Sequence, residues 1–495
     1  MRTASVAFLI STLTAAALTP LIRQLAIKYG LLDHAHGSRK VHGKPIPRLG
    51  GVAIIIAFMA PLLALAFFET SVGQLIQENR TQAIALLIGG LAIGALGLYD
   101  DIKGAGAKQK FTVQFIVATA MYYAGYQVEN IATPFSGPLS LGVFSMPLTV
   151  LWIVGVINAL NLIDGLDGLA GGVAMFAIGT TFVIAFRRGD AILVMYMACL
   201  GGAVLGFLFY NFNPASIFMG DSGSMFLGLV LAVSSMQASQ KASTTVAVLV
   251  PIIVLGFPIA DTLVAMVRRA IQGRPIFAAD REHIHHKLLG LGLSHRKAVL
   301  VLYAACILLA GTALLLSFAN SVEAAILLLT LSFTFVVGMR LLGFMRISDA
   351  GGATLKRKRN RELRSMVRNL GQQLSSAKDA QGIWRVVRTV AEPLETSAVS
   401  LALSMIDPHG DRQTTQFSTD SDGGPEGLTS RFEVTGRHAR NGELTFRWMD
   451  GRTEIIRDDE IAIEVLCDHI AAAWDRVCDR APRPSERDST DIRPN

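Results

Sequence analysis

Seven carboxylate and carboxamide side chains stand at the ends of strongly apolar stretches of this chain. They are Asp100, Asp101, Asn158, Asn161, Asp164, Asp167 and Asp221. In the segment NALNLIDGLDGLAGG, residues 158–172, four of them recur at intervals of three residues. On a helix this spacing aligns side chains along one slowly drifting stripe, although Gly165 and Gly168 are expected to break the helix midway.

Five carboxylates gathered near one interface would repel one another without a cation. Magnesium needs only one or two of them, because substrate phosphate oxygens and waters complete its octahedron. Asp221 lies in MGDSGS, where glycines allow a close approach of the backbone and a helix follows, which suits phosphate and metal together. Further donors come from Lys110, His283, His285 and His286. This inventory fits transfer of a phosphorylated group, in which positioning and charge neutralisation supply most of the catalysis.

Each motif taken alone also has an ordinary structural interpretation. An Asp-Asp pair after a helix is commonly a turn that faces water, and Gly-Asp-Ser-Gly is a common helix N-cap. The HIHH segment could be a solvated loop or a metal-binding trio. The argument for chemistry therefore depends on whether the topology brings the motifs to one place.

The composition indicates a polytopic all-α membrane protein. Of 495 residues, 51% are hydrophobic and 17% are charged, whereas a soluble protein carries about a quarter charged residues. The apolar residues fall in blocks long enough to cross a hydrocarbon core of about 30 Å as helices. We expect about eleven transmembrane helices, near residues 4–22, 50–68, 82–99, 111–126, 146–162, 169–186, 190–210, 223–240, 244–266, 298–318 and 322–342.

The basic residues predict the orientation of these helices. Lys and Arg gather in the loops after the first, third and ninth blocks, and Arg187 and Arg188 are the exceptions. The N-terminus is therefore expected outside and the C-terminus in the cytoplasm. On this topology all the polar motifs lie at the cytoplasmic face. Ionisable residues at such a depth are functional candidates, because burying them is expensive.

Cysteine usage and net charge exclude several classes of protein. Cys199, Cys306, Cys467 and Cys478 show no CxxC spacing, which argues against a disulfide framework or a zinc site. The formal charge of +7 reflects the basic cytoplasmic loops and a basic run after the last block, so no nucleic-acid partner is expected.

The chain is expected to contain a membrane domain, residues 1–346, followed by three further segments. Residues 347–379 read as a basic amphipathic linker helix, which could pair with a second copy to form a homodimer. Residues 380–480 read as a small cytoplasmic α/β domain that resembles GAF-type sensory domains, with a regulatory or structural role. Residues 481–495 are expected to be disordered.

The membrane part resembles the bacterial polyprenyl-phosphate N-acetylhexosamine-1-phosphate transferases. The resemblance covers about residues 5–340 and rests on the following motifs, in family order: RKVHGKPIPRLGG (39–51), DD (100–101), NALNLIDGLDGLAGG, FMGDSGS and DREHIHHKLLGLGLSHRKAVL. It implies that a UDP-N-acetylhexosamine donates its sugar 1-phosphate to undecaprenyl phosphate in the lipid bilayer, with release of UMP. It also implies Mg²⁺, with Mn²⁺ as a substitute, and an active site on the cytoplasmic face of the bacterial inner membrane.

The resemblance also implies roles for individual residues. Asp221 and Asn161 would hold the metal, and Asp100 with Asp101 would face the acceptor phosphate. The nucleotide would be lined by Asp164, Asp167, Asn211 and Phe218, with Asn158 also binding substrate. Diphosphate and sugar-phosphate contacts would come from Lys110, His283, His285 and His286. Lys40, His42 and Arg48 would bind substrate or, equally well, face lipid headgroups.

Two points of chemistry are implied less directly. The HIHH loop favours UDP-N-acetylglucosamine or a close epimer, for O-antigen, teichoic acid or related glycans, because the branch that uses UDP-muramoyl-pentapeptide usually shows three consecutive histidines. Ile284 interrupts them here. The acceptor phosphate is largely dianionic at pH 7 without help from a base, which favours direct attack over a covalent enzyme intermediate.

Three other classes of protein fit the sequence less well. A transporter would show internal halves with matching broken helices and charges at the midplane, and this chain shows neither. A membrane sensor would leave the membrane motifs unexplained. A CDP-alcohol-type phosphotransferase carries its carboxylates in one compact motif, whereas here they are spread along the chain.

Overall fold

The computed structural model describes eleven stretches of the chain, which form two separate units. The stretches are 2–33, 46–67, 71–133, 137–240, 249–271, 283–341, 350–406, 412–419, 427–436, 442–452 and 455–480. The first unit comprises Met1–Val267 and Ala279–Arg346, and the second comprises Arg268–Ala278 and Ile347–Asn495. Lys40 and His42 lie outside the described residues.

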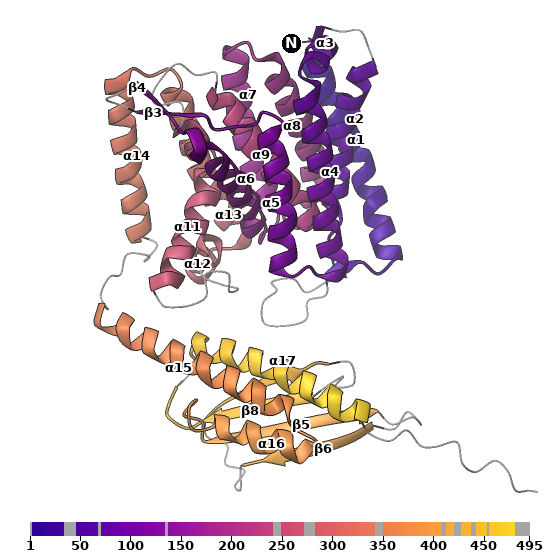
Figure 1. Ribbon diagram of the computed structural model, residues 1–495, viewed down its shortest axis with the longest axis vertical. Helices are drawn as coiled ribbons and strands as arrows, with labels where there is room; N and C mark the ends of the chain where they lie inside the picture. The colour runs from indigo at the N-terminus through magenta and orange to yellow at the C-terminus, as the bar shows by residue number, and fades with distance from the viewer. Residues whose placement is uncertain are drawn as a thin grey trace, which may run out of the picture. The chain divides into compact units, whose positions relative to one another are not determined.

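Helices dominate the chain up to residue 341 (Figure 1). They are α1 (Arg2–Lys28), α2 (Gly50–Phe67), α3 (Ser71–Glu78), α4 (Arg80–Lys103), α5 (Ala107–Tyr123), α6 (Ser145–Ile163), α7 (Leu169–Arg187), α8 (Ala191–Asn211), α9 (Gly220–Gln240), α10 (Leu249–Val254), α11 (Gly256–Ile271), α12 (Ile284–Gly290), α13 (His295–Leu316) and α14 (Ser321–Leu341). Two small antiparallel pairs join β1 (Leu32–Asp33) to β2 (Ile46–Pro47) and β3 (Asn130–Thr133) to β4 (Gly137–Ser140).

Seven of the described helices are long and apolar enough to cross a membrane. They are Arg2–Lys28, Arg80–Lys103, Gly142–Ile163, Leu169–Arg187, Ala191–Asn211, His295–Leu316 and Val322–Leu341. The protein is therefore a multi-pass membrane protein, as its composition predicts. The other predicted blocks are occupied by α2, α5, α9 and the pair α10–α11, which are shorter or less apolar, so the count of eleven spans stays a prediction.

The block predicted as one helix over residues 244–266 contains a break. The part of it that the structure describes consists of α10 and α11, which are separated at Leu255. Pro258 lacks a backbone N–H and cannot bond to the carbonyl group four residues earlier, so one helical hydrogen bond is lost at the break. Apolar composition alone could not reveal this division.

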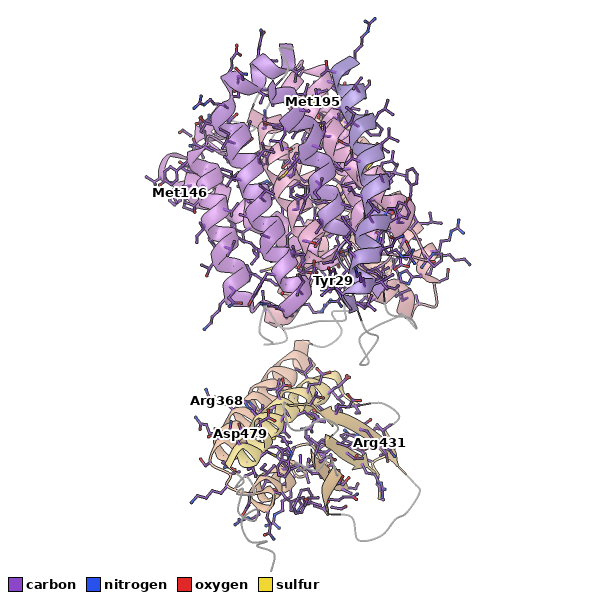
Figure 2. The ribbon with its side chains drawn as sticks, turned by 90° about the vertical axis from the view of Figure 1, so that its right-hand side faces the viewer. Tyr29, Met146, Met195, Arg368, Arg431 and Asp479 are labelled. Carbon is purple, nitrogen blue, oxygen red and sulfur yellow. The ribbon has the colours of Figure 1, made fainter. Side chains whose placement is uncertain are left out.

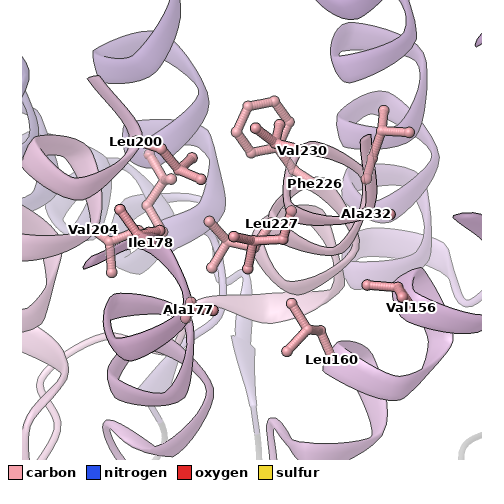
Figure 3. Close-up of a cluster of buried hydrophobic side chains, with 14 of the residues drawn as sticks. Val156, Leu160, Ala177, Ile178, Leu200, Val204, Phe226, Leu227, Val230 and Ala232 are labelled. Atoms are coloured by element: carbon pink, nitrogen blue, oxygen red, sulfur yellow. The ribbon is translucent and has the colours of Figure 1, made fainter. Parts of the chain in front are cut away.

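Helix α9 lies at the centre of the first unit and packs on α2, α4, α6 and α7. Figure 3 shows the buried side chains of this core, including Leu160 of α6, Ile178 of α7, Leu200 of α8 and Phe226 of α9. Gly228 lets α6 approach closely, because a Cβ atom there would lie 2.5 Å from the Cα atom of Ile157. The packing fixes the start of α9 relative to the ends of α4 and α6.

The C-terminal unit has a helical layer on a four-stranded antiparallel sheet. Its helices are α15 (Ala350–Ser375), α16 (Ala380–Val387) and α17 (Arg457–Arg480), and its strands are β5 (Ala398–Ile406), β6 (Arg412–Ser418), β7 (Leu428–Val434) and β8 (Gly442–Trp448). The strand order is β6-β5-β8-β7. In Figure 2, Arg368 and Asp479 mark the helices and Arg431 marks the sheet.

The basic helix α15 belongs to the core of this unit. Leu363, Val367, Leu370 and Leu374 are buried in the same hydrophobic cluster as the sheet and α17. The segment predicted as a linker therefore packs against the domain that follows it. The resemblance of this unit to GAF-type domains stays a prediction.

Candidate active site

One lysine joins two of the predicted carboxylates. The Lys110 ammonium group lies 2.7 Å from Oδ2 of Asp221 and also contacts Oδ2 of Asp100. Asp100 stands near the end of α4, Lys110 in the first turn of α5 and Asp221 at the start of α9. Side chains of Asp221 and Lys110 retain 28% and 22% of their exposure, so a soluble ligand can reach them.

Asp101, the neighbour of Asp100, points to a different partner. Its Oδ1 accepts a hydrogen bond from the backbone N–H of Asp221 at 2.8 Å, and its Oδ2 accepts one from the N–H of Ser222 at 3.1 Å. Both N–H groups lie in the first turn of α9, where the helix carries partial positive charge. Asp101 thus caps α9 and fixes the backbone that carries Asp221.

The start of α2 and the residues just before it form backbone hydrogen bonds with the segment before α9. The N–H of Gly50 donates to the carbonyl oxygen of Phe218 at 2.9 Å, and the N–H of Gly51 donates to that of Met219 at 2.8 Å. In the other direction, the N–H of Phe218 donates to Pro47 at 2.7 Å. Arg48 is therefore held beside the start of α9. Gly220 has a φ of +73°, and a Cβ atom on it would lie 2.2 Å from the carbonyl oxygen of Arg48.

Replacing Gly51 with alanine is expected to disrupt this part of the unit. The added Cβ atom would lie 2.1 Å from the backbone nitrogen of Gly223, and neither backbone can move without opening the contact between α2 and α9. We expect a lower yield of monodisperse protein and a lower melting temperature. Gly179→Ala is the matched control, because a Cβ atom there meets nothing within 4 Å. Equal stability of the two variants would contradict this account of the glycine.

The two asparagines of the central motif have different surroundings. Asn161 donates from Nδ2 to Oγ of Ser224 at 2.9 Å, so its side-chain oxygen Oδ1 is the atom that the predicted metal contact would use. Asn158 donates from Nδ2 to Oε1 of Gln114 and to the carbonyl oxygen of Val154, both at 2.7 Å. Gln114 is fully buried. Asn158 therefore links α6 to α5 beneath the site, in addition to its predicted role in substrate binding.

Asp167 and Asn211 hold the turns together. Oδ2 of Asp167 accepts hydrogen bonds from Asn213 Nδ2 at 2.9 Å and from the N–H of Ala215 at 3.0 Å. Oδ1 of Asn211 accepts from the N–H of Gly168 at 3.1 Å, and its Nδ2 donates to the carbonyl oxygen of Ile217. Both side chains are buried and are bonded to the segment that directly precedes Phe218, the predicted nucleotide contact.

Asp164 is a carboxylate in the turn after α6 whose ionisation is opposed by its surroundings. Burial, reinforced by the negative charges of Asp221, Asp101 and Asp167, raises the pKa of Asp164 to about 8, while Arg48 acts in the opposite direction. In the protein alone this carboxyl group is therefore mostly protonated at pH 7. A positive charge bound nearby would favour its ionised form.

The three histidines lie together at the start of α12. The rings of His283 and His285 are stacked with centroids 5.8 Å apart, and those of His285 and His286 lie 4.3 Å apart. Nε2 of His285 would lie 2.8 Å from a Cβ atom on Gly165, so the cluster rests directly on the turn that carries Asp164. Burial and the neighbouring His286 lower the pKa of His285 to about 3, so this imidazole is neutral at pH 7.

Among the described residues, the structure brings together most of the predicted site. Direct contacts join Asp100, Lys110 and Asp221, Asp101 caps α9, and Asn161 is bonded to Ser224 of the same helix. Sequence reasoning missed Gln114, Ser224 and Asp261. The signal for Asp261 was present, because a lone carboxylate interrupts the apolar run of α11.

Comparison with known proteins supplies the family. A family model described as glycosyl transferase family 4 matches residues 83–239. The probable undecaprenyl-phosphate N-acetylglucosaminyl 1-phosphate transferase of Bacillus subtilis is 40% identical over 299 residues, which cover 60% of this chain and 80% of that protein. The chain belongs to glycosyl transferase family 4. The resemblance inferred from the motifs is thereby confirmed.

Two further proteins are also similar to this chain. The decaprenyl-phosphate N-acetylglucosaminephosphotransferase of Mycolicibacterium smegmatis is 34% identical over 307 residues, which cover 57% of this chain and 74% of that protein. The phospho-N-acetylmuramoyl-pentapeptide-transferase of Halalkalibacterium halodurans is 30% identical over 307 residues, which cover 59% of this chain and 89% of that protein.

The stretch matched by the family model runs from α4 to α9. It therefore includes the contacts among Asp100, Lys110 and Asp221 and the bond from Asn161 to Ser224. The histidine cluster and the C-terminal unit lie outside it.

Proposed function

We propose that this protein transfers N-acetylglucosamine 1-phosphate, or a close N-acetylhexosamine 1-phosphate, from the UDP-sugar to undecaprenyl phosphate, and releases UMP. The observation that carries the proposal is the contact of Lys110 with both Asp100 and Asp221 at the ends of three helices. The names of the relatives support a polyprenyl-phosphate acceptor and a sugar phosphate as the transferred group.

The place of the site suits a reaction between one soluble and one lipid substrate. Asp100, Lys110, Asn161 and Asp221 all stand within a few residues of helix ends, where a bundle in a membrane meets water. The basic loops next to these ends support a cytoplasmic site in a bacterial inner membrane. The reaction would be the first membrane step in building a cell-surface glycan.

A magnesium ion fits the donors at this site. Asp221 offers a partly exposed carboxylate and Asn161 offers Oδ1, both at the α6–α9 contact. Within the described parts of the chain, no three His, Cys, Asp or Glu side chains are grouped as a metal site, but magnesium needs fewer protein ligands when phosphate oxygens complete its shell. When bound, the ion would neutralise charge on the diphosphate. A cation bound there would also favour the ionised form of Asp164, whose pKa is raised by burial and by the neighbouring carboxylates.

The direct reaction is the version that the hydrogen bonds favour. An oxygen of the lipid phosphate attacks the β-phosphorus of the UDP-sugar, the bond from that phosphorus to the bridging oxygen breaks, and its electron pair leaves with UMP. Asp100 is already engaged through both oxygens, with Lys110 and with the N–H of Ala105. Those bonds suit an electrostatic, positioning role for Asp100 more than the role of a free base or nucleophile.

UDP-N-acetylglucosamine is the donor we propose first. Ile284 separates His283 from His285 and His286, and the relatives with the two highest identities quoted above are named for N-acetylglucosamine. UDP-muramoyl-pentapeptide remains the alternative donor, because a phospho-N-acetylmuramoyl-pentapeptide-transferase is 30% identical.

The C-terminal unit has an accessory role, in regulation or assembly, in this proposal.

The test is UMP release by the purified full-length protein in detergent. UDP-N-acetylglucosamine and undecaprenyl phosphate are supplied together or singly, with Mg²⁺ or with excess chelator. We expect UMP only when donor, lipid acceptor and Mg²⁺ are all present. Release without the lipid would indicate a hydrolase. In a parallel assay UDP-muramoyl-pentapeptide replaces UDP-N-acetylglucosamine, and UMP release with this donor and not with UDP-N-acetylglucosamine would select the alternative.

Asp101→Asn is expected to lower kcat for UMP release by about tenfold to a hundredfold. The carboxamide presents an NH₂ group to the N–H of Asp221 or of Ser222, so the cap of α9 is partly lost and Asp221 is displaced. KM for the donor should change less than kcat. A variant with unchanged kcat would show that the cap is not needed to position Asp221.

A further inference from the structure

A buried carboxylate lies behind the histidine cluster. Asp261 of α11 is only 1% exposed, although it stands in the apolar run PIADTLVAM. Its Oδ2 lies 2.8 Å from Nδ1 of His283, and its Oδ1 accepts a hydrogen bond from the N–H of Ile284 at 2.8 Å. The two oxygens therefore serve two different groups, one a side chain and one the first turn of α12.

The carboxylate determines which ring atom of His283 can meet a ligand. An ionised carboxylate can only accept, so Nδ1 of His283 must carry a proton. Nε2 is then the ring atom left for a ligand. Carboxylate–histidine pairs of this kind commonly fix the tautomer and the orientation of a histidine in a functional site.

The orientation of His283 is passed to the rest of the cluster by packing. Its ring is stacked on that of His285 with an angle of 7° between the planes. His285 in turn lies so close to Gly165, one residue from Asp164, that a Cβ atom on Gly165 would be 2.8 Å from its Nε2. A change at Asp261 would therefore reach the central motif through two histidines, although Asp261 contributes no atom to it.

We infer that Asp261 is a positioning residue for the phosphotransfer site, because its carboxylate orients His283 and keeps a proton on Nδ1. This inference rests on the proposed function. Asp261 does not touch the substrates; it acts through His283, which is predicted to contact the diphosphate or the sugar phosphate.

Two substitutions separate this role from simple anchoring of α12. In Asp261→Asn, the carboxamide oxygen can still accept the N–H of Ile284, but its NH₂ group faces Nδ1 and requires the opposite tautomer of His283. In Asp261→Ala, both hydrogen bonds are lost. If the carboxylate only anchored the helix, Asn would preserve activity and Ala would not.

The experiment measures kcat and KM for UMP release from UDP-N-acetylglucosamine by full-length protein with Mg²⁺ and undecaprenyl phosphate. The variants are Asp261→Asn, Asp261→Ala, His283→Ala and the double variant Asp261→Asn/His283→Ala. Asp190→Asn is the matched control, because Asp190 is also a buried carboxylate that accepts a backbone N–H, that of Leu193, at the start of α8. All rates are normalised to folded protein from size-exclusion profiles and melting curves.

We expect both Asp261 variants to lose about tenfold or more in kcat. In the His283→Ala background, Asp261→Asn should cost less than about twofold, because its effect passes through His283. Asp190→Asn should keep wild-type kcat. The inference is overturned if Asp261→Asn retains wild-type kcat, or if its loss is undiminished without His283. A wild-type protein that releases no UMP would instead refute the proposed function.

Discussion

Asp221→Asn is expected to lower the rate of UMP release by about a thousandfold, the largest effect of any single substitution in this account. The carboxylate lies 2.7 Å from Lys110 at the start of α9 and is the proposed magnesium ligand. The carboxamide keeps the shape of the side chain and removes its charge. The loss should therefore appear in kcat at saturating Mg²⁺, with little change in the melting temperature.

The control for Asp221→Asn is again Asp190→Asn. Asp190 follows the C-terminal end of α7, a helix of 19 residues and thus about 28 Å in length, whose N-terminal end adjoins the site. It should retain activity within about twofold. A loss of less than tenfold in Asp221→Asn would show that this carboxylate is not a ligand of a catalytic metal ion.

Lys110→Met is expected to lower UMP release by about a hundredfold or more. The substitution keeps most of the apolar length of the side chain and removes the only cation that the described structure shows in direct contact with both Asp100 and Asp221. We expect kcat to fall and KM for the UDP-sugar to rise, because the ammonium group would also attract the diphosphate. The measurement is steady-state UMP release at varied donor concentration.

Lys103→Met is the matched control for Lys110→Met. Lys103 is an exposed lysine at the end of α4, and its ammonium group lies 5.8 Å from the centre of the Tyr99 ring. It should retain nearly full activity. If both lysine variants lose activity to the same extent, the general positive charge of this face matters and the specific contacts of Lys110 do not.

The sequence predicts the helices of the first unit well, because helical membrane spans need long apolar runs and little else. The predicted runs correspond to helices even where α2, α5 and α9 are short or less apolar. The break between α10 and α11 was missed, because apolar composition does not record the loss of a single backbone N–H at Pro258.

The motifs also predicted that Asp100, Lys110, Asn161 and Asp221 would approach one another. The motifs could not predict which partner each of two neighbouring residues would contact. Asp100 and Asp101 are adjacent in sequence, yet successive residues of a helix differ by about 100° in direction. One side chain therefore meets Lys110, and the other meets the N-terminus of α9.

Contacts between distant segments depend on packing that no local pattern encodes. Asn158 and Gln114 are 44 residues apart, and their bond exists because α5 packs on α6. Asp261 and His283 are 22 residues apart in the sequence, and only their contact in the folded protein shows that they form a pair. Sequence reasoning can name such residues as candidates, but it cannot assign their partners.

The central claim is that phosphorus moves with the sugar, and the most direct test follows that atom. UDP-N-acetylglucosamine labelled with ³²P at the β-phosphorus is incubated with the protein, undecaprenyl phosphate and Mg²⁺, and the lipids are then extracted. We predict that the label enters the lipid fraction in an amount equal to the UMP released. Label that stays in the water phase as UDP, while sugar enters the lipid, would contradict phosphosugar transfer and identify an ordinary glycosyl transfer instead.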